Sequence, residues 1–118
     1  MNREVDEEMG VGNPKIVPKD WMTSCWCPDD KILLHFFCKE ITEQEFYNLE
    51  QNGLKAREYG VEVLGLIRVP LYCRKRNNGG FPMFLKNNFA GNARANLLDT
   101  LVIKQILTKD EIQTCLNC

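Results

Sequence analysis

Two stretches of the chain carry apolar residues at the three- and four-residue spacing of an amphipathic helix. Residues 42–53 begin with Thr42 followed by Glu45, a capping box that marks a helix start. Residues 92–107 repeat leucine, valine and isoleucine on one face and predict a second helix. Another Thr-x-x-Glu capping box begins at Thr108 and predicts a short final helix.

The chain also contains a region typical of β-strands between these helices. Residues 61–76 are rich in β-branched and aromatic residues, and a second short run, residues 81–86, follows an Asn-Asn-Gly-Gly turn. This pattern predicts a β-hairpin, with Pro70 at a bulge or an edge position. We therefore expect an α+β fold in which a β-hairpin or small antiparallel sheet is packed by two or three helices.

The length and the composition favour a single folded domain. A chain of 118 residues, 44% hydrophobic and 26% charged, is in the ordinary globular range. Residues 1–20 combine acidic residues with glycine and proline and show little apolar periodicity, which predicts a flexible N-terminal arm. The predicted domain then spans residues 21–118.

The sequence favours a protein inside the cell that does not cross a membrane. No apolar run reaches the length of a spanning helix. The first twenty residues are acidic, whereas a secretory signal has basic residues followed by an apolar stretch. We therefore predict an intracellular location, cytoplasmic or nuclear, in which six cysteines serve as reduced thiols or metal ligands.

Three cysteines and the chain's one histidine lie within residues 23–38, TSCWCPDDKILLHFFC. Cys25, Cys27, His35 and Cys38 supply the thiolate and imidazole ligands that zinc prefers in a tetrahedral site. On a strand, His35 and Cys38 would point to opposite faces, so a site that uses both needs a helix or a turn there. The alternative is that this stretch is a buried core strand with a hydrogen-bonded histidine.

The C-terminal pair Cys115 and Cys118 offers other possibilities. It could join Cys25 and Cys27 in one all-thiolate zinc site, or lie near Cys73 as a partial second site. A C-x-x-C pair is also a redox motif, but the thioredoxin type follows a strand at a helix start, whereas this one ends the sequence.

Charge is unevenly distributed along the chain. Residues 63–98 contain six basic residues and no acidic one, although the whole chain has a net charge of −1. Cations interleaved with aromatic residues are typical of surfaces that bind single-stranded RNA. The alternative is that the phenylalanines are core residues and the cations form a solvated turn. The predicted phosphate-binding residues are Arg74, Lys75, Arg76 and Lys86, and the predicted base-stacking residues are Tyr72, Phe81 and Phe84.

The sequence shows none of the familiar constellations of catalytic residues. There is no phosphate-binding P-loop, no zinc-protease motif and no serine-hydrolase elbow, and one histidine leaves little for acid–base chemistry. We therefore predict a small zinc-stabilised, non-enzymatic protein that binds RNA through the basic hairpin. The alternative is an adaptor or regulatory factor that binds a protein partner through Trp21, Met22 and Trp26, with structural cysteines.

Overall fold

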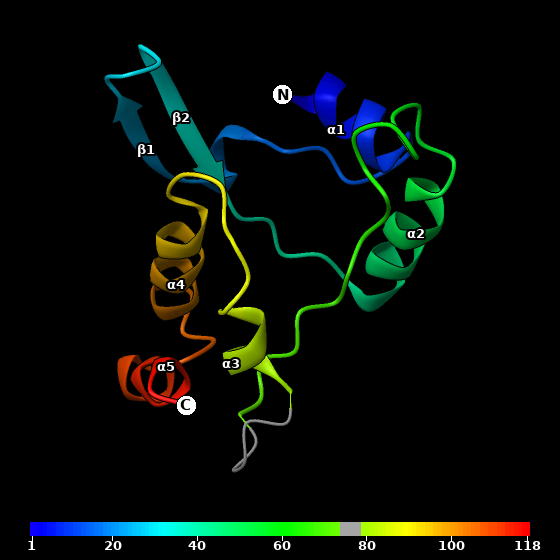
Figure 1. Cartoon of the computed structure of the whole chain (residues 1–118). Coiled ribbons are helices and arrows are strands. Elements are labelled where there is room, and N and C mark those ends of the chain that lie inside the picture. The colour runs from blue at the N-terminus through cyan, green and yellow to red at the C-terminus, as the bar shows by residue number, and fades with distance from the viewer. Residues whose placement is uncertain (74–78) are drawn as a thin grey trace. The chain divides into compact units, whose positions relative to one another are not determined.

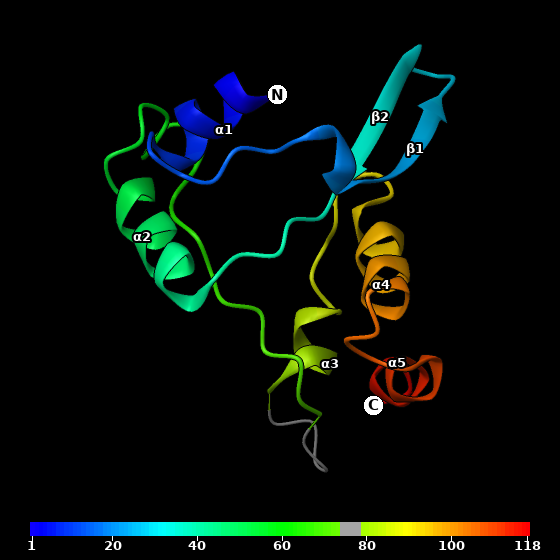
Figure 2. The ribbon, with the colours of Figure 1, turned by 180° about the vertical axis from the view of Figure 1, so that it is seen from behind.

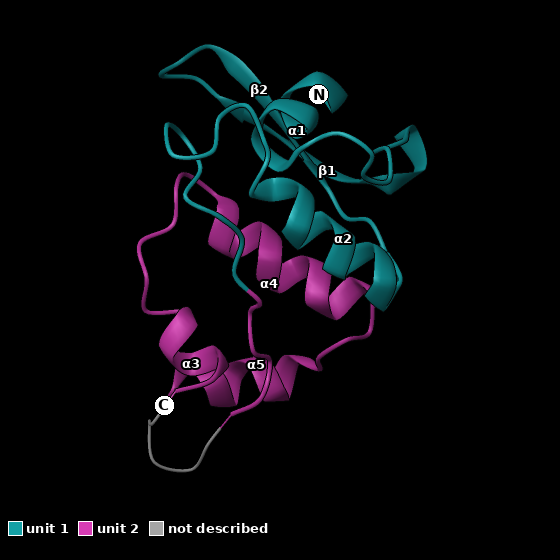
Figure 3. Ribbon diagram, turned by 90° about the vertical axis from the view of Figure 1, so that its right-hand side faces the viewer, with its two compact units in different colours: residues 1–67 teal, residues 68–118 magenta. Residues whose placement is uncertain are grey.

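The structure is a computed structural model that describes residues 1–73 and 79–118. The chain divides into two compact units, residues 1–67 and residues 68–118 (Figure 3). Unit 1 contains, in order, helix α1 (Asn2–Met9), the 3₁₀ turn η1 (Pro18–Asp20), strands β1 (Trp21–Cys27) and β2 (Ile32–Phe37), and helix α2 (Glu43–Gly53). Unit 2 contains helices α3 (Phe81–Phe84), α4 (Ala93–Ile103) and α5 (Lys109–Leu116) (Figure 1).

The sheet is an antiparallel pair formed by β1 and β2, which run beside each other in Figure 2. Ser24 lies opposite His35 and Cys25 lies opposite Leu34, and the register shifts between Trp21 and Thr23. Because side chains alternate along a strand, Cys25 and Ser24 point to opposite faces. Both faces have exposed apolar side chains: Trp26 and Leu33 lie on the Ser24 face, and Ile32 and Leu34 lie on the Cys25 face.

Both capping boxes predicted from the sequence are confirmed. At the start of α2, Thr42 Oγ1 accepts a hydrogen bond from the Glu45 N–H (3.2 Å), and Glu45 Oε2 accepts one from the Thr42 N–H (2.8 Å). Thr108 and Glu111 make the same two bonds at the start of α5. These bonds satisfy N–H groups that a helix leaves unpaired at its first turn.

The predicted β-hairpin is wrong in its position. In the described part of residues 59–86 the structure has two isolated bridges, Tyr59 with Val63 and Cys73 with Gly80, and no regular strand. Residues 81–84 form α3 because Pro82 lies in the first turn of that helix, where proline needs no N–H partner and already has a helical φ. The α+β class with a small antiparallel sheet is confirmed, but its strands lie in the cysteine-rich segment.

The core of unit 2 is centred on Phe81, whose side chain is fully buried. Leu85, which follows α3, Leu101 of α4, and Ile112 and Cys115 of α5 complete the cluster, so α3, α4 and α5 all border it. The apolar spacing that predicts helix 92–107 therefore reflects the burial of one face of α4.

Residues 1–20, for which the sequence predicts a flexible arm, contain α1 and η1, and α1 packs against α2. Asn13 connects the two helices: its Nδ2 donates to the Gly10 carbonyl oxygen (2.8 Å), and its Oδ1 accepts from Asn52 Nδ2 (2.9 Å). The Glu58 N–H also donates to the Glu7 carbonyl oxygen (2.9 Å). The domain boundary after residue 20 remains a prediction.

Replacing Gly10 by Ala is expected to destabilise unit 1 by about 3 kcal/mol or more. Gly10 ends α1 at φ 89° and ψ 161°, a conformation that essentially only glycine adopts, and an added Cβ would collide with the Asn52 carbonyl group. Gly60→Ala is the matched control, because Gly60 has φ +83° but open space around the Cβ position. Urea unfolding followed by tryptophan fluorescence measures both variants, and equal losses would show that the collision has no effect.

Asp20 connects the start of β1 to the residues that follow β2. Its carboxylate accepts hydrogen bonds from the Val17 N–H (2.9 Å) and from Lys39 Nζ (3.1 Å), and its carbonyl oxygen accepts one from the Cys38 N–H (2.8 Å). The bond from Val17 lowers the pKa of Asp20 below its ordinary value of 3.8; burial opposes this shift, and Lys39 reinforces it.

A depressed pKa in the folded state predicts a stabilising effect of Asp20 that is present above pH 3.8 and disappears as the pH falls through the folded-state pKa. We therefore expect Asp20→Asn to lower the urea midpoint of unit 1 at pH 7, and its difference from wild type to shrink progressively as the pH falls below 3.8. Asp29→Asn, in the exposed turn between β1 and β2, is the control and should change little over this pH range. If the difference in urea midpoint between wild type and Asp20→Asn stayed the same in acid, the stabilising role of the Asp20 carboxylate would be contradicted.

Candidate functional site

Helix α1 presents acidic side chains at helical spacing. Glu7 and Glu8 follow Glu4 by three and four residues, which places the three carboxylates on neighbouring positions of the helix surface. Glu4 and Glu8 are exposed, whereas Glu7 is half-buried and its Oε1 lies 3.6 Å from an Nη1 atom of both Arg3 and Arg57. The two arginines hold the Glu7 carboxylate between them.

Arg3 and Arg57 offset the charge of Glu7, and Glu4 Oε2 lies 3.9 Å from the amino group of Met1. The exposed carboxylates of Glu4 and Glu8, one helical turn apart, repel each other, and a bound cation would relieve this repulsion. Carboxylate oxygens are the ligands that Mg²⁺ and Mn²⁺ prefer. Among residues 1–73 and 79–118, no three histidine, cysteine or acidic side chains converge closely enough to hold a metal ion by themselves. Magnesium usually retains several waters and takes only one or two protein carboxylates together with substrate phosphates, so the donor set of α1 fits such an ion.

This group of carboxylates is hidden in the sequence, because acidic residues near glycine and proline are also typical of the solvated arm predicted for residues 1–20. The available signal was the spacing Glu4, Glu7 and Glu8, which is the spacing of one helical face. Glycine and proline in residues 10–18 obscured the helix that precedes them.

The structure does not bring the four predicted zinc ligands together. Cys25 and Cys27 lie two residues apart on one face of β1, whereas His35 is opposite Ser24 on the other face of the sheet. The imidazole Nδ1 of His35 lies 2.6 Å from Ser24 Oγ, and Cys38 follows β2. A strand forms where a helix or turn was needed, so zinc stabilisation is not shown.

The alternative zinc ligands lie in different surroundings. Cys115 is buried in the core of unit 2, and Cys118 Sγ lies 3.3 Å from Cys73 Sγ. Cys118 thus lies beside Cys73, but the described residues offer no third convergent ligand, and a partial second metal site there remains a prediction. A zinc site shared with Cys25 and Cys27 remains a prediction.

The predicted RNA-binding residues fall into three groups. Arg74, Lys75 and Arg76 lie outside the described residues. Tyr72 and Lys86 are exposed, as a role in binding requires. The two phenylalanines are core residues: Phe81 has no exposed surface, and Phe84 packs against the rings of Phe81 and Phe89. The assignment of Phe81 to base stacking needs correction, because a fully buried ring cannot stack on a base.

The predicted protein-binding residues lie on β1. Trp21 and Trp26 are exposed, and Met22 is half-buried. Trp21 Nε1 donates a hydrogen bond to Ser24 Oγ (2.8 Å), which in turn contacts His35. A largely apolar pocket of about 540 Å³ is lined by Trp21, Ser24 and His35 together with Met1, Pro18 and Phe37.

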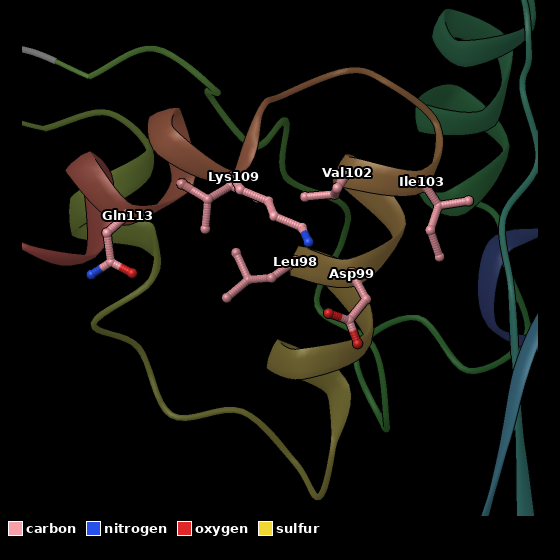
Figure 4. A pocket seen from close by; sticks show the side chains of 7 residues that line it. Leu98, Asp99, Val102, Ile103, Lys109 and Gln113 are labelled. Carbon is pink, nitrogen blue, oxygen red and sulfur yellow. The ribbon is translucent and has the colours of Figure 1, made fainter.

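A second pocket, of about 630 Å³, lies between α4 and α5. Figure 4 shows Leu98 and Val102 on α4 and Lys109 extending from α5 toward that helix. This pocket has one acidic and one basic residue in an otherwise apolar or neutral lining, and neither an aromatic ring nor a cluster of cations. It therefore lacks the groups that bind a nucleotide.

No helix among the described residues is both long enough and apolar enough to cross a membrane. This agrees with the absence of a long apolar run in the sequence. The intracellular location remains a prediction.

Residues 1–107 match the family Nudt16-like: U8 snoRNA-decapping enzyme-like. The U8 snoRNA-decapping enzyme of Xenopus laevis is 37% identical over 99% of this chain and 57% of its own length, and that of Bos taurus is 39% identical over 86% and 53%. The Tudor-interacting repair regulator protein of Homo sapiens is 30% identical over 88% of this chain and 50% of its own length. The chain thus spans about half the length of the curated relatives it matches.

These relatives contradict the prediction of a non-enzymatic binding protein. The family and its members with 37–39% identity are named for an RNA-decapping enzyme. The prediction of a non-enzymatic protein was based on the absence of P-loop, zinc-protease and serine-hydrolase motifs. Carboxylates on a helix, which can serve metal-assisted hydrolysis, belong to none of these patterns.

Proposed function

The chain belongs to the Nudt16-like: U8 snoRNA-decapping enzyme-like family, and from this premise we propose that it acts in the hydrolysis of capped RNA. The reaction would be cleavage, by water, of a phosphoanhydride bond in the 5′ cap. The observation that carries this proposal is the 37–39% identity to U8 snoRNA-decapping enzymes over most of this chain. The matched residues 1–107 include the acidic helix α1.

The chemistry of the substrate explains the need for an acidic helix. A cap is attached through several anionic phosphates, which carboxylates would repel in the absence of a cation. A divalent cation such as Mg²⁺ or Mn²⁺, when bound, supplies positive charge to the phosphate oxygens and lowers the pKa of a bound water. In this proposal Glu4 and Glu8, the exposed carboxylates of α1, are its ligands.

Glu7 has a different part in this proposal. Arg3 and Arg57 both form ion pairs with its Oε1 atom, each at 3.6 Å. The Glu7 carbonyl oxygen also accepts the hydrogen bond from the Glu58 N–H (2.9 Å), which attaches α1 to the segment after α2. Glu7 is therefore a positioning residue that holds α1 in place, and the exposed carboxylates beside it are available to the ion.

The basic stretch would supply contacts to the RNA chain. Lys86 carries an exposed ammonium group, and Tyr72 exposes 54% of its surface. An ammonium group binds a phosphate, and an exposed aromatic ring stacks on an unpaired base. Arg74, Lys75 and Arg76 are proposed as further phosphate contacts on the basis of their charge.

Binding to a protein partner is a second candidate function. It is favoured by the 30% identity to Tudor-interacting repair regulator proteins. It is also favoured by exposed apolar side chains on the sheet, among them Trp21 (51% exposed) and Trp26 (56% exposed). A chain with this function alone would bind its partner without cleaving RNA.

The test is incubation of the 118-residue chain with RNA carrying a radiolabelled 5′ cap, in Mg²⁺ or Mn²⁺. We expect release of the labelled cap nucleotide, loss of this release when EDTA removes the cation, and no degradation of the same RNA without a cap. Absence of cap release in both cations, from a chain that is folded by circular dichroism, would refute the proposed hydrolysis and leave partner binding as the function to examine.

A further inference from the structure

Two thiols of unit 2 that are far apart in the sequence, one before α3 and one after α5, lie next to each other. Cys73 Sγ lies 3.3 Å from Cys118 Sγ, although 45 residues separate them. Cys73 is exposed, and Cys118 is half-buried. This separation exceeds a disulfide bond length of about 2.05 Å by little more than 1 Å.

Structured neighbours hold both cysteines in place. The Phe81 N–H donates to the Tyr72 carbonyl oxygen (2.9 Å), and Cys73 pairs with Gly80 in an isolated antiparallel bridge. Cys118 follows α5, which is anchored in the core by Cys115, and its Sγ donates to the Thr114 carbonyl oxygen (3.2 Å). These contacts connect both cysteines to the core of unit 2 and hold the two sulfurs close together.

We propose that Cys73 and Cys118 form a redox-modification site in which a low-molecular-weight disulfide, such as glutathione disulfide, converts the two thiols into an intramolecular disulfide. The exposed thiolate of Cys73 attacks the reagent and forms a mixed disulfide, with release of one glutathione thiolate. The thiolate of Cys118 then attacks the Cys73 sulfur and releases the second one. The protein loses two electrons and two protons, and glutathione disulfide is reduced to two molecules of glutathione.

The environment of the two thiols supports this order of steps. The hydrogen bond with Cys73 raises the pKa of Cys118, burial raises it further, and the charge of Lys86 acts in the opposite direction. The raised pKa disfavours the Cys118 thiolate, and Cys73 is the more exposed of the two thiols, so Cys73 is the one that meets the reagent first. The third cysteine of the unit, Cys115, is only 5% exposed and is part of the core, which protects it from the reagent.

The bond would join the segment before α3 to the end of α5. It would close a long loop that contains each of the three helices of unit 2, and cross-links across long loops restrict the unfolded chain most. We expect the oxidised chain to show hydrogen exchange in α5 at least about ten-fold slower than the reduced chain. Equal exchange rates would refute this conformational effect.

The experiment is equilibration of the 118-residue chain with glutathione and glutathione disulfide, followed by acid quench, alkylation and peptide mapping by mass spectrometry. We expect a Cys73–Cys118 link in wild type that glutathione reverses, that persists in Cys115→Ser and Cys27→Ser, and that is absent in Cys73→Ser. The effective concentration of the pair should fall at least about ten-fold in urea, because the folded structure holds the sulfurs together. A predominant Cys115–Cys118 link, or an equal yield of the Cys73–Cys118 link in urea, would overturn the proposal.

Discussion

Replacement of Glu8 by Gln is expected to reduce the rate of cap release at least about 100-fold, a loss of about 2.7 kcal/mol of transition-state stabilisation. Gln keeps the size of the side chain and its helix propensity but removes the negative charge that would hold the cation. Glu8 is exposed on α1, so the substitution leaves no cavity and should not unfold the helix. Glu4→Gln should have a similar effect, because Glu4 lies one helical turn away on the same face.

Glu62→Gln is the matched control for this prediction. Glu62 is also exposed in unit 1, and its substitution makes the same change of charge, but it lies outside α1. Mn²⁺ binding, followed by the electron paramagnetic resonance signal of the free ion, gives a readout that does not depend on catalysis. Normal cap release by Glu8→Gln would refute a ligand role for Glu8, and weakened Mn²⁺ binding by Glu62→Gln would indicate a general charge effect instead.

Local signals predicted α2, α4 and α5, whose chemistry is contained in a few residues, but they missed α1 and α3. Thr42 with Glu45, and Thr108 with Glu111, satisfy N–H groups within one helical turn, so the bonds seen in the structure follow from the sequence alone. The apolar face of α4 was predictable for the same reason: its period matches the helix, and its residue Leu101 is buried in the core.

Strand pairing was not predictable in the same way, because it depends on contacts between separate segments. Residues 61–73 have the composition of a strand, yet the structure pairs Trp21–Cys27 with Ile32–Phe37. The short Pro-Asp-Asp-Lys turn at residues 28–31 allows this pairing, with Lys31 at φ 53°. The zinc hypothesis depended on the same segment, and the alternation of side chains along a strand separates Cys25 from His35.

The carboxylate site was hidden for another physical reason. Acidic residues in a glycine- and proline-containing N-terminal stretch resemble a solvated tail, and only the knowledge that residues 2–9 are helical places Glu4 and Glu8 on one face. The role of Phe81 was similarly ambiguous, because aromatic residues beside cations occur both in cores and on RNA-binding surfaces. Burial decides the role of Phe81: its ring lies fully inside the core cluster of unit 2.

Replacement of Phe81 by Ala is expected to destabilise unit 2 by about 3–5 kcal/mol. The ring of Phe81 is fully buried between residues of α4 and α5, so its removal loses the transfer free energy of the side chain and leaves a cavity. Met83→Ala is the matched control: Met83 is on the same short helix but is 44% exposed, and its loss should cost less than about 1 kcal/mol.

Native-state hydrogen exchange of the α4 and α5 amides measures the two variants within unit 2, where tryptophan fluorescence is uninformative because both tryptophans lie in unit 1. Phe81→Ala should accelerate exchange at Leu101 and Ile112 at least about 100-fold, since each 1.4 kcal/mol corresponds to a factor of ten. Exchange in α2 reports unit 1 and serves as the internal reference. Acceleration of less than about three-fold by Phe81→Ala, no larger than that by Met83→Ala, would mean that the Phe81 ring contributes little to this core.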